Sequence, residues 1–97
     1  MRILIADASP LYRRGVRLFL QQAGFRSLVM ETNCLDDMHR FVNFYYKDRW
    51  GQQQGLDLVI LDRCLPGLTT FSQLSGFNLA HPPRFLVMAE SVDRAFI

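Results

Sequence analysis

Two short apolar runs, each ended by an aspartate, most constrain what this chain can fold into. The run ILIA at residues 3–6 precedes Asp7, and the run LVIL at residues 58–61 precedes Asp62. Unbroken apolar runs of this length are typical of strands buried on both faces of a parallel sheet. Ligands of open α/β sheets bind in the crevice beyond the carboxyl ends of the strands. Asp7 and Asp62 are therefore the first candidate site residues.

A purely structural interpretation of Asp62 remains open. An aspartate that ends a strand can accept backbone hydrogen bonds from its own turn and have no chemical role. Pro66 and Gly67 follow closely and indicate such a turn.

Helical and extended patterns alternate along the rest of the chain. Ser9 and Pro10 form a helix start, and Gly24 is the expected end of that helix. A weaker strand is predicted at residues 27–31, a helix at 36–46, a short helix within 69–79 and a fourth strand at 85–89. This alternation predicts βαβ units, a parallel sheet and right-handed crossovers, which define an α/β fold.

The first predicted helix is amphipathic. Leu11, Leu18 and Phe19 recur at helical spacing and form an apolar stripe, whereas Arg13 and Arg17 belong to the face expected to be solvated.

Composition excludes several classes of protein. Eleven Lys and Arg against nine Asp and Glu give a formal charge of only +2, which is too slight to favour nucleic acid. No apolar run reaches the roughly 18 residues of a membrane span, and the first residues lack the apolar core of a signal peptide. Cys34 and Cys64 lie far apart without metal-ligand spacing, so two reduced thiols in a cytoplasmic protein are expected.

Two longer stretches resemble the receiver domain of two-component response regulators. They are ILIADASPLYRRGVRLFLQQAGF at residues 3–25 and DLVILDRCLPG at residues 57–67. Among these receivers, the sequence resembles the LuxR type most. The resemblance extends over residues 1–97 and implies a flavodoxin-like, doubly wound parallel sheet with strand order 2-1-3-4-5. Because the chain stops at Ile97, we expect an incomplete receiver-like domain of four strands, without the fifth strand and the last helix.

The resemblance also implies roles for individual residues. Asp62 matches the position that accepts a phosphoryl group from a histidine kinase. Asp7 and Ala8 match two acidic positions that help to hold Mg²⁺, and the backbone carbonyl of Cys64 is a further metal ligand. Phosphoryl transfer needs charge neutralisation and positioning, so such carboxylates serve a hard cation and not acid–base chemistry.

Two positions depart from the family pattern. Ala8 replaces the second acidic residue, and Ala89 stands at the switch position, where the family has a Thr or Ser hydroxyl. The Lys that ends the missing fifth strand is absent as well. Of the five site side chains usual in the family, this sequence retains only Asp7 and Asp62. We therefore expect an eroded phosphorylation site and weak or absent Mg²⁺ binding.

Three function classes follow. The favoured one is a non-enzymatic receiver-like module that acts through protein–protein contacts in signal transduction and transcription regulation. The second is a competent phosphoacceptor on Asp62 in a phosphorelay. The third is an unrelated α/β enzyme or nucleotide binder, although the chain has no GxGxxG, P-loop or DxD nucleophile motif.

The fourth strand suggests how copies of the chain associate. Without a fifth strand, the apolar stretch FLVM at residues 85–88 becomes a sheet edge with unpaired backbone groups, which is a template for another chain. We expect a homodimer through this edge. Leu11, Leu18 and Phe19 are expected to be left exposed by the missing last helix.

Overall fold

The computed structural model describes residues 1–24, 28–46, 55–74 and 83–88. Within these ranges the elements are β1 (Arg2–Ala6), α1 (Pro10–Gln22), β2 (Leu28–Thr32), α2 (Leu35–Tyr46), β3 (Leu58–Asp62), the 3-10 helix η1 (Phe71–Leu74) and β4 (Arg84–Met88). The strands and helices alternate as the sequence predicts. The short helix predicted within residues 69–79 is confined to the single 3-10 turn of η1 in the described part of that region.

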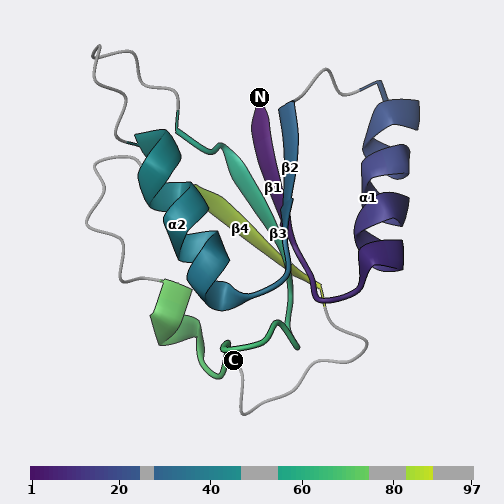
Figure 1. Cartoon of the computed structure of the whole chain (residues 1–97). Coiled ribbons are helices and arrows are strands. Elements are labelled where there is room, and N and C mark those ends of the chain that lie inside the picture. Colours follow the sequence, from purple (N-terminus) through teal and green to yellow (C-terminus); the bar gives the residue numbers. More distant parts are fainter. Residues whose placement is uncertain (25–27, 47–54, 75–82, 89–97) are drawn as a thin grey trace.

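The four strands form one parallel sheet in the order β2-β1-β3-β4 (Figure 1). Ala6 of β1 pairs with Thr32 of β2 on one side and with Leu61 of β3 on the other. The chain thus winds outward from β1 first in one direction and then in the other. This is the doubly wound, flavodoxin-like receiver fold, and the fold class predicted from the sequence is confirmed.

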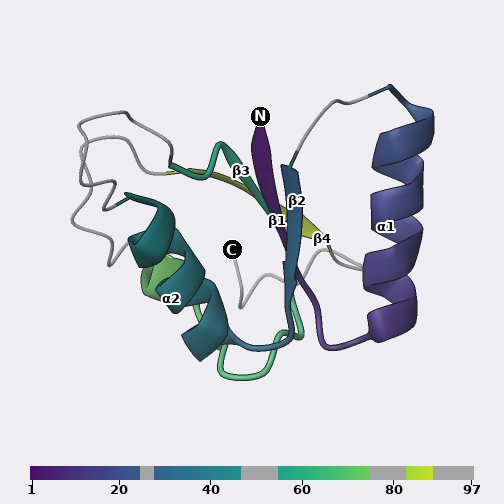
Figure 2. The same cartoon turned by 45° about the horizontal axis from the view of Figure 1, so that its top comes forward.

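The helices lie on opposite faces of the sheet, α1 on one and α2 with η1 on the other (Figure 1, Figure 2). The α2 face buries the larger apolar cluster, formed by Leu4, Ala6, Leu35, Met38, Val42, Leu56, Val59, Leu61, Leu65 and Leu68. The α1 face buries a much smaller cluster, formed by Ile3, Ile5, Leu20 and Ile60. The core is therefore unequal, because α1 covers only part of its face of the sheet.

Local capping explains the bounds of α1. The hydroxyl oxygen of Ser9 accepts a hydrogen bond from the Tyr12 backbone N at 3.2 Å, and Pro10 opens the first turn. At the other end Gly24 adopts a φ of +80°, the left-handed conformation that follows many helices. Both ends of the helix lie where the sequence predicts them.

One sequence prediction about α1 is wrong. Arg13 and Arg17, assigned to the solvated face, are half-buried and turn toward β2, where both contact Glu31. The spacing of apolar residues defines the stripe that faces the sheet, but it does not reveal an acidic partner on a neighbouring strand. By contrast, Leu11, Leu18 and Phe19 are exposed as expected.

Candidate functional site

The two candidate aspartates lie at the same edge of the sheet. Because Ala6 pairs with Leu61 in adjacent parallel strands, the next residues, Asp7 and Asp62, follow at neighbouring positions. This edge is the carboxyl end of β1 and β3, where the chain reverses its direction of winding. Ligand sites of open α/β sheets form at this switch point. The tertiary structure therefore places at one sheet edge two aspartates that are far apart in sequence.

Asp7 is buried and held in the turn that leads into α1. Its carboxylate Oδ1 accepts a hydrogen bond from the Ser9 backbone N at 2.8 Å, and its own N donates to the Thr32 carbonyl at 3.0 Å. The carbonyl oxygen of Asp7 accepts from Nη1 of Arg13 at 2.5 Å. Contacts of the Asp7 backbone with β2 and with Arg13 fix the position of the residue, and the Ser9 N holds its carboxylate.

Asp62 is half-buried at the end of β3. Its backbone carbonyl accepts a hydrogen bond from the Leu65 N at 3.1 Å and so closes the turn that follows. The next residue, Arg63, donates its backbone N to the Met88 carbonyl at 3.0 Å, which ties this turn to β4. Since a main-chain oxygen closes the turn, the turn itself does not require a carboxylate at position 62.

The remaining predicted site residues differ in what they contribute. Ala8 is exposed beside Asp7 and brings no side-chain oxygen to the edge. Cys64 lies two residues beyond Asp62 with an exposed, free thiol, and Cys34 is also free. Ala89 lies outside the described residues.

A metal ion at this edge has a limited donor set. In the part of the chain that the structure describes, no group of three or more His, Cys, Asp or Glu side chains could hold a metal ion together. Mg²⁺ is usually bound through one or two carboxylates with water in the other positions. Asp7 and Asp62, with the main-chain carbonyl of Cys64, therefore fit a hydrated Mg²⁺ in part, and one oxygen of Asp7 is already engaged by Ser9.

An ion-pair network lies beside the candidate site and was not foreseen from the sequence. Glu31 of β2 accepts hydrogen bonds from Nε of Arg13 at 3.1 Å and from Nη2 of Arg17 at 2.8 Å. Partial burial alone raises the pKa of Glu31, but the hydrogen bonds and charges of Arg17 and Arg13 outweigh it and lower the pKa below its ordinary value. Since Arg13 also holds the carbonyl of Asp7, the network links β2 to the turn that carries the candidate site.

The fold is consistent with an α/β receiver-type domain, and comparison with curated proteins supports a response-regulator-like family. The chain is 27% identical over 81 residues to a two-component response regulator, ORR1, of Oryza sativa subsp. japonica. This alignment covers 84% of this chain and 35% of the relative. The chain is also 33% identical over 91 residues to a glycerol metabolism activator of Pseudomonas putida. That alignment covers 92% of this chain and 38% of the relative.

These relatives support a response-regulator-like family and a signalling receiver module. The chain spans little more than a third of the length of the curated relatives that it matches. No family model matches the sequence, and no solved structure matches it. Among the described residues, no helix combines the length and apolar character needed to cross a membrane.

Proposed function

We propose that this chain is a receiver-like signalling module of the two-component, LuxR type whose phosphorylation site is eroded. It acts in the cytoplasm mainly through protein–protein contacts, in signal transduction and transcription regulation, and not as an enzyme. The proposal rests on one observation: Asp7 and Asp62 lie at the same edge of the sheet, and the residue beside them is Ala8. The scaffold that aligns the two strands is retained, while an acidic group beside them is replaced by a methyl.

The chemical consequence concerns charge. A phosphoryl group in transfer carries negative charge that metal ions and cationic side chains must neutralise. Asp7 and Asp62 would hold Mg²⁺ here, and the ion would supply that neutralisation when bound. Because Ala8 contributes no oxygen, Asp7 and Asp62 would hold the ion with fewer protein ligands. Losing one such stabilising contact typically lowers a rate by roughly two to three orders of magnitude.

A second candidate function is a competent phosphoacceptor that takes a phosphoryl group on Asp62 from a histidine kinase. Its support is the position of Asp62, half-buried at the switch point and adjacent to the buried Asp7. The two candidates differ in one measurable property, which is modification of Asp62.

The test is incubation with acetyl phosphate, or with beryllofluoride, in the presence of Mg²⁺. We expect little or no added mass by intact-protein mass spectrometry, and no beryllofluoride-dependent chemical shifts near Asp62. The Asp62→Asn variant provides the background. Stoichiometric modification of the wild type that Asp62→Asn abolishes would establish the phosphoacceptor function instead.

A further inference from the structure

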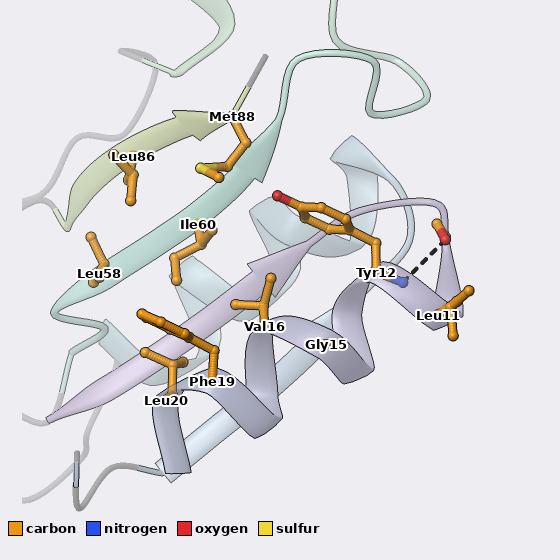
Figure 3. Close-up of a pocket in the computed structure, with 11 residues that line it drawn as sticks. Leu11, Tyr12, Gly15, Val16, Phe19, Leu20, Leu58, Ile60, Leu86 and Met88 are labelled. Carbon is orange, nitrogen blue, oxygen red and sulfur yellow. Dashed lines mark hydrogen bonds between the residues drawn. The ribbon is translucent and has the colours of Figure 1, made fainter. Parts of the chain in front are cut away.

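An apolar groove of about 800 Å³ lies between α1 and the β3–β4 half of the sheet. Its floor consists of Leu58 and Ile60 from β3 with Leu86 and Met88 from β4 (Figure 3). Its wall is α1, from which Tyr12 and Phe19 point toward the strands (Figure 3). No charged side chain lines the groove among the described residues.

The groove exists because one helix is too narrow for this face. Neighbouring strands lie about 4.8 Å apart, whereas a helix with its side chains is about 10 Å across, so one helix covers about two strands. Leu20 of α1 packs with Ile3, Ile5 and Ile60 over the middle of the sheet. Within the described part of the chain, no element covers β4 on this face, and Leu86 remains 50% exposed.

The outer side of α1 carries two large apolar side chains beside the exposed polar residues Arg14 and Gln22. Leu11 and Leu18 are two helical turns apart and therefore share one side, and they are 81% and 48% exposed. Leu11 is one of the residues that line the groove, although its side chain points away from the strands of its own sheet (Figure 3). A helix with apolar side chains toward its sheet, toward a groove and on its outer side is typical of a helix with partners in several directions.

Gly15 lies at the centre of this apolar surface. A Cβ placed on Gly15 would meet no atom within 4 Å, so packing within the described structure does not require glycine. Glycine in a helix interior is nevertheless less favourable than alanine. An open glycine between the apolar turns of Leu11 and Leu18 allows a second helix to approach α1 closely.

We propose that the groove between α1 and β4 is a two-fold interface with a second copy of this chain. The two α1 helices cross near Gly15 and lie between the two sheets. The flank of each helix, with Tyr12 and Phe19, packs against the other helix. Its outer side, with Leu11 and Leu18, covers the open floor of the partner's sheet. Such an isologous contact is self-complementary, because it joins one exposed apolar surface to its own copy.

The exposed area is sufficient for such a dimer. The large side chains left in contact with solvent here are Leu11, Tyr12, Leu18, Phe19, Leu86 and Met88. At roughly 100 Å² each they expose about 600 Å² per copy, the upper end of apolar patches on monomers. Two copies that covered all of this area would bury at most about 1,200 Å², which is the lower end of the range of specific, stable interfaces.

Charge permits the same contact. Of the three arginines of α1, Arg13 and Arg17 turn toward β2 and pair with Glu31, away from the groove. Arg14 is exposed, one helical turn from both Leu11 and Leu18. A second copy can enter the groove without burying a charge there, and the long side chain of Arg14 can keep its guanidinium in water at the rim of the contact. The proposed interface also differs from the pairing of β4 edges predicted from the sequence, because it uses side chains of α1 and not backbone groups of β4.

Sedimentation equilibrium of matched variants tests the proposal. Phe19 and Phe44 are 67% and 73% exposed, but Phe44 is on α2, which covers the other face of the sheet. We expect the wild type and Phe44→Glu to be dimers at micromolar concentration. Phe19→Glu should weaken the dimer at least about ten-fold in its dissociation constant, the equivalent of about 1.4 kcal/mol. Circular dichroism of each variant verifies that it is folded.

A second variant keeps the test decisive if Phe19→Glu fails to fold. Gly15→Ala should weaken the dimer because its methyl lies at the helix crossing, yet raise the melting temperature under dilute, monomeric conditions. A wild-type monomer at micromolar concentration would overturn the proposal. A dimer insensitive to both Phe19→Glu and Gly15→Ala would overturn it in favour of pairing through the β4 edge.

Discussion

Gly67 lies directly against Leu35, so that a Cβ on Gly67 would stand only 3.1 Å from the Leu35 Cβ. The backbone of Gly67 also has a φ of +92°, which side chains of L-residues rarely adopt. Leu35 in turn donates its N to the Pro66 carbonyl at 2.9 Å. The turn after Asp62 is thereby joined to the first residue of α2.

Gly67→Ala should destabilise the fold by about 1–3 kcal/mol, because the substitution adds both backbone strain and the contact with Leu35. Gly24→Ala is the matched control, since Gly24 has a φ of +80° but nothing within 4 Å of its Cβ position. Urea denaturation should show a larger loss in the free energy of unfolding for Gly67→Ala than for Gly24→Ala. Equal losses would mean that Leu35 moves aside without cost.

Glu31→Gln should lower the free energy of unfolding by about 1 kcal/mol at neutral pH, since the partly exposed pairs with Arg13 and Arg17 lose their charge. The pKa of Glu31 is lowered in the folded state, chiefly by Arg17 and Arg13, so its contribution is complete above the pKa of the unfolded chain and is lost as the pH falls through the folded pKa. Denaturation curves of wild type and variant should therefore converge in acid.

Arg14→Gln provides the control for that experiment. Arg14 is an exposed arginine of the same helix, and its loss should change the free energy of unfolding by no more than about 0.5 kcal/mol. A difference between wild type and Glu31→Gln that persists unchanged in acid would show that packing, and not charge, supplies the contribution of Glu31.

Ser9→Ala should cost about 1 kcal/mol of stability, because the first turn of α1 loses the acceptor for the Tyr12 N. Ser9→Asn retains a capping oxygen and should recover most of the loss. Thermal unfolding followed by circular dichroism measures both variants. If Ser9→Asn were as unstable as Ser9→Ala, capping would not explain the role of Ser9.

Ala8→Asp should increase the affinity for divalent cations, since it adds a third carboxylate next to Asp7 and Asp62 at the same sheet edge. Paramagnetic broadening of amide signals by Mn²⁺ reports the binding. The added Asp62→Asn change should reverse the gain. Equal Mn²⁺ titrations for wild type and Ala8→Asp would argue that the two native carboxylates do not share one ion.

The strands and helix ends could be predicted from the sequence because their determinants are local. Four consecutive apolar residues at 3–6 and at 58–61 can be buried only by a strand with both faces covered, and both runs are indeed buried except for the half-buried Leu58. Ser9, Pro10 and Gly24 fix the bounds of α1 through backbone geometry and capping within a few residues. These choices do not depend on distant parts of the chain.

The tertiary structure decided which distant groups meet. Strand order, which only the family resemblance had suggested, makes β1 and β3 neighbours and so brings Asp7 to the edge shared with Asp62. It also places Glu31 beside Arg13 and Arg17, which an amphipathic pattern assigns to solvent. Helix α1 has more apolar residues than can pack between one helix and its face of the sheet. Periodicity reports that a residue is apolar, but only the arrangement of layers determines whether anything covers it.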